Sequence, residues 1–294
     1  MTWEDQLIQV YCDVCTLYHQ YLWQYCERFS HNAHPEFTDE EVITIYLFGI
    51  MEKRFEVAHI HKHAQDHLAH WFPKLPSYGG YIQRLNKLSA VFPPLLNALA
   101  PTWDHGAKAG LTFLLDSMPI ILARGTRRFQ AKVAREVADC GYCASKKLAY
   151  YGLKLHVLGI RQAGTLPHPE YLELTSARAH DITVLDGIRS NLRHGHLYVD
   201  KAYASEVLET LLVSQEMFLL TPTKKAKGQE KLRMFDQLWS TSVSRVRQPI
   251  ESFFSWLERK TGIQIASNVR SLNGLLVHVY GRLSAAMYML SFNS

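Results

Sequence analysis

The chain has 294 residues and a formal net charge of +5; 47% of its residues are hydrophobic and 20% are charged. This composition supports a buried core and excludes an intrinsically disordered chain, and the length suits one large domain or two smaller ones. The mild excess of positive charge permits nucleic-acid binding without requiring it.

The sequence carries no sign of membrane insertion or secretion. Its apolar runs are too short to span a bilayer, and the acidic start MTWEDQLIQVYCDVC lacks a signal-peptide pattern. Five cysteines, an odd number, argue against a secreted disulfide framework. We therefore expect a cytoplasmic protein. The pairs Cys12/Cys15 and Cys140/Cys143 have the spacing of zinc ligands, but scattered thiols in a reducing cytosol are the interpretation we favour.

Residues 1–105 carry helical patterns. Thr38 followed by Glu41 is a capping-box signature, which predicts the start of a helix. Further helices are predicted over about 56–71 and about 77–91. Four histidines in the first of these share one helix face and invite a metal hypothesis, against which we favour solvated side chains: His59, His63, His67 and His70.

The helix predicted over 77–91 carries polar and basic residues between its apolar positions, and we expect Pro93 and Pro94 to end it. A short helical cluster with a basic last helix is typical of proteins that enter a DNA groove. An ordinary solvated helix face explains the pattern equally well. Arg84 and Lys87 are the candidate DNA contacts of this helix.

The pattern changes to strands after residue 105. An apolar run over 111–115 ends at Asp116, as in a buried central strand with a polar tip. The other predicted elements are strands at 151–157 and 171–175, a helix at 182–192, a strand at 197–199, a helix at 207–212, a strand at 217–221, a helix that begins near Pro249, and a last helix at 272–290. Three strands followed by alternating helices and strands predict an α/β fold with a mixed sheet and flanking helices.

Three carboxylates stand out by position in this order of elements. Asp116 ends the first predicted strand, Asp200 ends the fourth, and Glu251 lies on the helix after the last strand. Each acid alone is most often a cap, but acids at strand ends are held by a rigid sheet, where function concentrates. Because clustered carboxylates repel, such a site suits a hard cation such as Mg²⁺ or Mn²⁺.

Several segments together resemble those of a bacterial insertion-sequence transposase, and the insertion-sequence family nine-eight-two is the closest match we can name. The segments are LPSYGGYIQRLNKL (75–88), LLDSMPI (114–120), YYGLKLHVLG (150–159), ARAHDI (177–182), YVDKAY (198–203) and RQPIESFFSWLERKTGI (247–263). The resemblance covers roughly residues 35 to 290. Each segment by itself is weak evidence for the family. The occurrence of all of them in this order along the chain makes the match specific.

The resemblance implies an RNase H-like core of the Asp-Asp-Glu type at 106–294, with C-terminal helices, preceded by a helical region at 1–105 that binds DNA ends. It implies that Asp116, Asp200 and Glu251 hold Mg²⁺ or Mn²⁺. The implied reaction is cleavage of double-stranded DNA at the element's terminal inverted repeats, followed by joining of the 3′-hydroxyl to target DNA. A homodimer or higher multimer on the DNA of a bacterial nucleoid is implied as well.

One departure from a related branch affects the third acid. That branch carries a Tyr-x2-Arg-x3-Glu-x6-Lys signature, in which Arg247 and Glu251 fit the middle while Ser244 and Glu258 replace the Tyr and the Lys. Glu258 is the rival third acid, and we favour Glu251 because Arg-x3-Glu precedes the aromatic core residues. Asp181 is a further possible metal ligand, for which helix capping is the favoured interpretation.

Two basic stretches, 121–149 and 223–233, are the predicted phosphate-binding loops, with solvated mobile loops as the alternative. Lys154 and His156 project from one side of their strand, towards DNA or towards solvent, and Lys201 directly follows Asp200. The candidate DNA contacts outside 77–91 are Arg124, Arg127, Arg128, Lys132, Lys154, Lys201, Lys224, Lys225 and Arg247. The alternatives to a transposase are a resolvase-like metal-dependent nuclease and a DNA-binding relic without catalysis.

Overall fold

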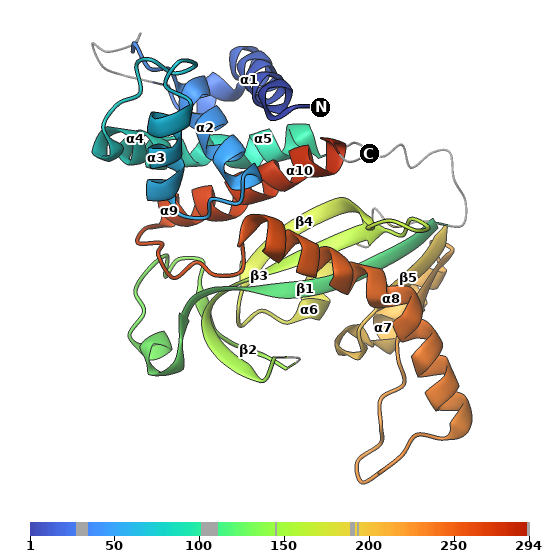
Figure 1. Cartoon of the computed structure of the whole chain (residues 1–294). Helices are drawn as coiled ribbons and strands as arrows, with labels where there is room; N and C mark the ends of the chain where they lie inside the picture. Colours follow the sequence, from blue (N-terminus) through green and yellow to red (C-terminus); the bar gives the residue numbers. More distant parts are fainter. Residues whose placement is uncertain (28–34, 101–110, 145, 189–191, 193, 293–294) are drawn as a thin grey trace. The chain divides into compact units, whose positions relative to one another are not determined.

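The computed structural model describes residues 1–27, 35–100, 111–144, 146–188, 192 and 194–292 (Figure 1). The chain divides into two compact units. Unit 1 comprises Met1–Pro101 together with Leu257–Ser294, and unit 2 is Thr102–Trp256. The C-terminal helices therefore group with the N-terminal helices, whereas the sequence pattern placed them with the second region.

Unit 1 is helical. The capping box predicted at Thr38 is confirmed, because the Thr38 amide donates to Glu41 Oε2 at 2.6 Å and the Glu41 amide donates to Thr38 Oγ1 at 3.3 Å. Its elements are α1 (Trp3–Gln20), η1 (Leu22–Tyr25), α2 (Asp39–Met51), α3 (Val57–His67), α4 (Tyr78–Lys87), η2 (Ser89–Val91), α5 (Phe92–Leu99), α9 (Leu272–Leu276), the π-helical turn η6 (Val277–Gly281) and α10 (Arg282–Phe292).

The prolines after α4 do not end a helix, contrary to the expectation. Pro93 and Pro94 lie in the first turn of α5, where a backbone amide has no partner within the helix and proline is tolerated. The preceding helix α4 ends before them, at Lys87. A proline pair therefore marks the start of a new helix here.

The core of unit 1 forms around α2, which is buried on nearly all sides. The Tyr46 hydroxyl of α2 donates to the Val277 carbonyl at 3.2 Å, across a sequence separation of 231 residues. A Cβ atom on Gly281 would lie 2.5 Å from the Tyr46 ring, so glycine permits this close approach. The C-terminal helices thus pack against α2 and help to bury it.

Unit 2 is built on a curled mixed sheet. Its elements are β1 (Leu111–Arg124), η3 (Gly125–Phe129), β2 (Asp139–Cys143), β3 (Leu148–Ile160), β4 (His168–Ser176), α6 (Asp181–Ile188), β5 (Gly195–Val199), η5 (Lys201–Tyr203), α7 (Glu206–Val213), β6 (Met217–Leu220) and α8 (Met234–Thr261), whose last residues belong to unit 1. The strand order is β2-β3-β1-β5-β6, and β4 also pairs with β3.

Strands β1, β2, β3 and β4 pair antiparallel, while β5 pairs parallel with both β1 and β6. This arrangement confirms the predicted mixed α/β fold with flanking helices and agrees with an RNase H-like core. The strands predicted at 151–157, 171–175, 197–199 and 217–221 correspond to β3, β4, β5 and β6.

Three boundaries differ from the sequence-based expectation. Strand β1 does not end at Asp116 but continues to Arg124, because its second half pairs with β3 as far as Tyr150. Strand β2 was not predicted. Helix α8 begins at Met234 rather than near Pro249, which lies inside the helix, where it lacks an amide to donate to the preceding turn. The first turns of α8 bury few residues, so they give little of the periodic pattern on which the prediction relied.

Helices cover both faces of the sheet. Phe113 and Leu115 of β1 pack in one cluster with residues of α6 and α7. Successive strand residues point to opposite faces, so Leu114 and Asp116 face the other way. On that side lies α8, where Ile250 Cδ1 would be 3.5 Å from a Cβ atom on Gly159. Among the described residues, no helix combines the length and apolar character that a membrane span requires.

Candidate active site

Asp116 and Asp200 lie next to each other on neighbouring parallel strands. Leu115 of β1 pairs with Val199 of β5, and the two aspartates are the next residues along each strand. Asp200 directly follows β5 and caps η5, its Oδ1 accepting a hydrogen bond from the Lys201 amide at 2.8 Å. The parallel register therefore brings together two carboxylates that are 84 positions apart in sequence (200 minus 116).

Arg247 of α8 joins Asp116 to Glu251. Its Nη1 donates to Asp116 Oδ2 at 2.7 Å, and its Nη2 donates to Glu251 Oε1 at 2.5 Å. The Arg247 side chain is only 13% exposed and that of Asp116 20%, whereas Glu251 is 53% exposed. Because Arg247 and Glu251 are four residues apart on one helix, they share a face that looks towards β1.

The electrostatics of this cluster centre on Asp116. Burial raises the pKa of Asp116 from its ordinary value of 3.8 to about 6. The Arg247 guanidinium and the Ser117 amide oppose this rise, while the neighbouring carboxylates of Asp200 and Glu251 add to it. The site thus holds three mutually repelling acids and one arginine that offsets part of their charge.

Tyr203 lies close to this cluster, and the sequence pattern gave it no role. Tyr203 is 1% exposed, and its hydroxyl lies near the Ser117 side chain without a well-formed hydrogen bond among the described residues. Burial and the charges of Asp181, Asp116 and Asp200 raise its pKa far above the ordinary range of a tyrosine. The only sequence signal for Tyr203 was its place in the Asp-Lys-x-Tyr segment.

Lys154 is turned towards an acid. Its Nζ donates to Asp181 Oδ1 at 2.9 Å and to the Ala179 carbonyl at 2.8 Å. Asp181 is the first residue of α6, a position where a carboxylate is favoured by the helix dipole. His156, on the same strand, is fully buried, and one ring nitrogen lies 2.9 Å from Thr175 Oγ1. Because it is buried, His156 does not face DNA as one interpretation of the pattern suggested, and the same burial lowers its pKa to about 4.

The rival third acid has a different partner. Glu258 Oε2 accepts a hydrogen bond from the Gln264 amide at 2.7 Å, beyond the end of α8. Glu251, by contrast, shares Arg247 with Asp116. The structure therefore connects Glu251, and not Glu258, to Asp116 through a common partner.

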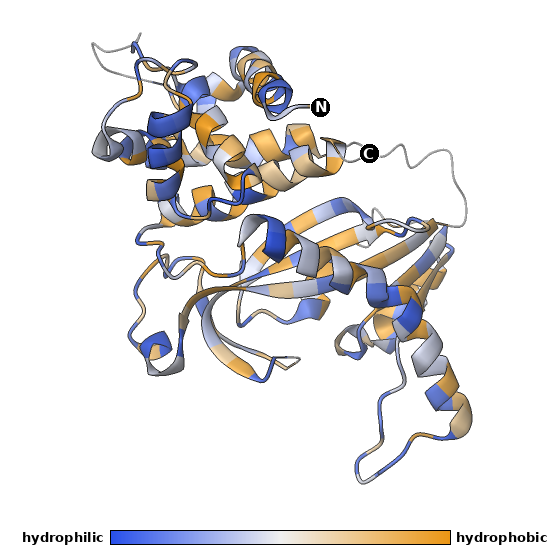
Figure 2. Cartoon of the chain, viewed as in Figure 1, coloured by the Kyte–Doolittle hydropathy of each residue, from blue (hydrophilic) through white to orange (hydrophobic). Residues whose placement is uncertain are grey.

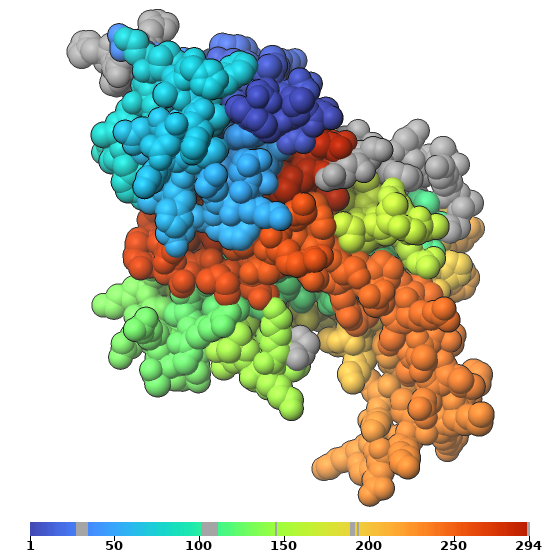
Figure 3. Space-filling model, in the orientation of Figure 1, coloured from blue at the N-terminus to red at the C-terminus, as the bar shows by residue number. Residues whose placement is uncertain are grey.

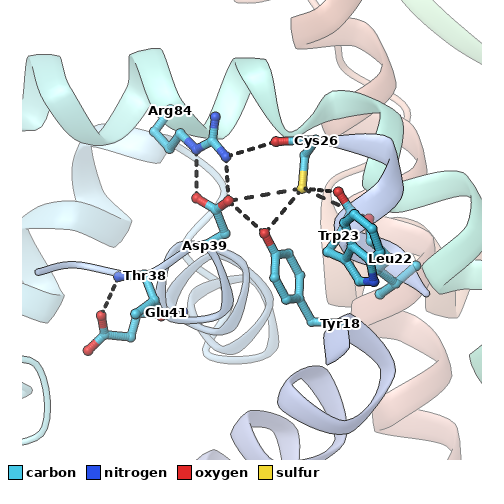
Figure 4. Close-up of polar contacts among 8 residues, drawn as sticks. All are labelled: Tyr18, Leu22, Trp23, Cys26, Thr38, Asp39, Glu41 and Arg84. Atoms are coloured by element: carbon cyan, nitrogen blue, oxygen red, sulfur yellow. Dashed lines mark hydrogen bonds and ion pairs between the residues drawn. The ribbon is translucent and has the colours of Figure 1, made fainter. Parts of the chain in front are cut away.

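Arg84 lies in a polar cluster of unit 1 instead of projecting to solvent (Figure 4). Its Nε donates to Asp39 Oδ1 at 2.6 Å, its Nη2 also pairs with Asp39, and Nη2 reaches the Cys26 carbonyl at 3.3 Å. Asp39 is 4% exposed and also accepts from the Tyr18 hydroxyl at 2.8 Å. Arg84 therefore ties α4 to α2 through Asp39, while Lys87, the other candidate on this helix, is exposed.

The other predicted DNA contacts divide by exposure. Lys154 and Arg247 are engaged by acids, as described above, and Arg128 is half-buried with its Nη1 donating to the Gly125 carbonyl at 3.0 Å. Lys225 donates to the Glu230 carbonyl at 2.7 Å but remains exposed. The exposed candidates are Arg124, Arg127, Lys132, Lys201, Lys224 and Lys225.

No three His, Cys, Asp or Glu side chains in the described part of the chain are arranged closely enough to hold an ion in this structure. Of the four histidines considered, His63 and His67 contact each other, with ring centroids 4.9 Å apart, while the His70 ring contacts Trp71 at 5.4 Å. His59 is exposed, and His70 lies beyond the end of α3. None of the four cysteines of these pairs forms a disulfide.

Comparison with known proteins gives one match. The family model described as "Transposase DDE domain" matches residues 105–269, which include all three acids and Arg247. No curated protein and no solved structure matches the chain.

Proposed function

The chain belongs to the family of transposase DDE domains, and on that premise we propose that it cuts DNA at the ends of a mobile element and joins the freed 3′-hydroxyl to target DNA. The observation that carries the proposal is the link between Asp116 and Glu251 through Arg247, beside Asp200. We further propose that the element is of the kind represented by the insertion-sequence family nine-eight-two, on the segments quoted above.

The donor types suit a hard divalent cation, and the three acids would have to draw closer together than they are in this structure, where Arg247 bridges Asp116 and Glu251. Asp116, Asp200 and Glu251 are the residues that would hold Mg²⁺ or Mn²⁺. Supporting this assignment, the Asp116 carboxylate is buried and its pKa is raised, in part by the two other acids, so a bound cation would relieve an unfavourable charge arrangement. When bound, such ions polarise phosphoryl oxygens and promote deprotonation of water at neutral pH.

The residues of the chain have separate tasks in this proposal. The acids keep their geometry because two are fixed to adjacent strands and the third to the helix that packs on the same face. Arg247 holds Asp116 and Glu251 in place through one guanidinium. We propose that Lys201, which is exposed and follows Asp200, contacts a DNA phosphate near the acids.

DNA would be held mainly by charge. The exposed basic residues of 121–149 and 223–233 suit phosphate contacts that do not read bases. We propose that residues 1–105 bind the element end, that 106–294 carry the catalytic core, and that a homodimer or higher multimer assembles on the DNA.

The test is cleavage and joining of a labelled DNA that carries the ends of the element encoding this chain, with Mg²⁺ or Mn²⁺. Asp116→Asn, Asp200→Asn and Glu251→Gln should abolish both steps while DNA binding persists. Glu258→Gln is the matched control and should retain both. Cleavage without joining would favour a resolvase-like nuclease, and binding without cleavage by the unaltered chain would favour a relic. Loss of activity in Glu258→Gln but not in Glu251→Gln would reassign the third acid.

A further inference from the structure

Arg247 engages oxygens of two of the three acids in the candidate site. Asp116 Oδ2 accepts a hydrogen bond from Arg247 Nη1 at 2.7 Å, and Glu251 Oε1 accepts one from Arg247 Nη2 at 2.5 Å. The other oxygen of Asp116, Oδ1, accepts from the Ser117 amide at 2.8 Å. The Ser117 amide is fixed in β1, whereas the arginine side chain can rotate about its bonds. Arg247 is therefore the partner of these acids that can be exchanged.

The Arg247 side chain is incompletely satisfied where it lies. Its Nε is buried and has no hydrogen-bond partner among the described residues, although both of its terminal nitrogens donate to acids. A buried donor without an acceptor is unfavourable. A guanidinium that served only as a permanent bridge would gain stability from an acceptor at Nε as well. The observed contacts thus favour an arginine that has a second position.

The outer side of α8 offers Arg247 such a second position. Ser244, Arg245 and Gln248 are exposed on the neighbouring turns, and the Glu251 side chain is 53% exposed. Figure 3 shows α8 at the surface of unit 2, and Figure 2 shows hydrophilic residues along this helix. A DNA phosphate that approaches the acids from this side would meet the guanidinium, whose planar fork can bind a phosphate through two hydrogen bonds.

We propose that Arg247 is an exchangeable counter-ion, which pairs with Asp116 and Glu251 while these acids hold no divalent ion and passes to a DNA phosphate when they do. The exchange rests on the proposed function, because its acids are the proposed ion ligands. Since the guanidinium and the ions compete for the same oxygens, the protein alone should bind the ions weakly. DNA that draws Arg247 away should tighten ion binding, and this coupling is reciprocal.

A permanent bridge makes the opposite prediction. If Arg247 only aligned Asp116 and Glu251, its removal would let the two carboxylates separate, and the divalent ion would bind less tightly. If Arg247 competes with the ion, its removal frees one oxygen of each acid, and the ion binds more tightly. The sign of the change in ion affinity therefore distinguishes the two roles.

The test is the affinity of the full chain for Mn²⁺, measured by electron paramagnetic resonance of the free ion, without DNA and with a duplex that carries the element end. Mn²⁺ bound by the duplex alone is subtracted. Arg247→Met should bind Mn²⁺ roughly tenfold more tightly than the unaltered chain without DNA, and DNA should tighten its binding much less. Arg245→Met removes the same charge from an exposed position two residues away and is the matched control, which should behave as the unaltered chain does.

Two more variants complete the experiment. Arg247→Lys keeps the charge without the planar fork, so its Mn²⁺ affinity should lie between those of the unaltered chain and Arg247→Met. Equal or weaker binding by Arg247→Met would overturn the proposal. Asp116→Asn added to Arg247→Met should abolish the gain; a gain that persists would show that the acids are not the ligands and would overturn the proposed function as well. Circular dichroism confirms that each variant is folded.

Discussion

Ionisation of Asp116 should lower the stability of the metal-free protein, and Asp116→Asn should remove this effect. The pKa of Asp116 is raised by burial, from 3.8 to about 6, so between these values the folded state binds more protons than the unfolded state. Stability therefore falls as pH rises through this window. Below pH 3.8 the acid is protonated in both states and contributes no difference.

The size of the effect follows from the two pKa values. One pKa unit corresponds to about 1.4 kcal/mol, so the difference between about 6 and 3.8 corresponds to about 3 kcal/mol. This is an upper limit for the gain in Asp116→Asn, because asparagine also loses the charge-assisted hydrogen bond from Arg247 at 2.7 Å. The gain should be complete above about pH 6.

The assay is urea unfolding of the unaltered chain and of Asp116→Asn in the presence of a chelator, at a series of pH values from mildly acidic to mildly basic. The difference in unfolding free energy should grow with pH and then level off. Mg²⁺ should narrow it by stabilising the ionised carboxylate. A difference that is independent of pH, or an asparagine variant that becomes less stable as pH rises, would refute the reasoning.

Three further substitutions test contacts described above, each by urea unfolding. Arg84→Met should destabilise the protein by about 3–5 kcal/mol, because it removes the cation that offsets the charge of the buried Asp39 carboxylate; the exposed Lys87→Met should change stability by less than about 0.5 kcal/mol, and equal effects would contradict the buried pair. Gly281→Ala should cost about 1–3 kcal/mol, since its Cβ would lie 2.5 Å from the Tyr46 ring, and an unchanged midpoint would show that the ring moves aside. Tyr203→Phe removes a buried hydroxyl that lacks a well-formed hydrogen bond and should stabilise the protein by about 1 kcal/mol, whereas clear destabilisation would show that its interaction with Ser117 is a stabilising hydrogen bond.

The sequence predicted correctly those helices and strands whose pattern is contained within a few neighbouring residues. The capping box at Thr38 and the alternation in β3 each depend on residues within a few positions, and both were readable. The start of α8 was not, because its first turns expose apolar residues and bury little besides Val243. The extent of β1 past Asp116 was hidden as well, since it depends on pairing with β3 rather than on its own sequence.

The surroundings of the candidate site depended on partners distant in sequence. Arg84 is 45 positions from Asp39, and Lys154 is 27 from Asp181. A basic side chain on a polar helix or strand face has the same local pattern whether it meets DNA or a buried acid. Only the tertiary fold distinguishes a DNA contact from an ion pair with a buried acid. For this reason the acids of the candidate site were easier to predict than the environment of the basic side chains.

The composition of unit 1 from both ends of the chain has a consequence for its synthesis. The Arg282 guanidinium donates to the Phe55 carbonyl across 227 residues, and the Val277 carbonyl accepts from Tyr46 across 231. The ribosome must therefore synthesise all of unit 2 before the C-terminal helices can pack against α2 and complete unit 1. A chain that terminates before Leu257 would contain the strands that carry Asp116 and Asp200 but would lack the C-terminal part of unit 1. Such truncated products should fold poorly and be degraded readily by proteases.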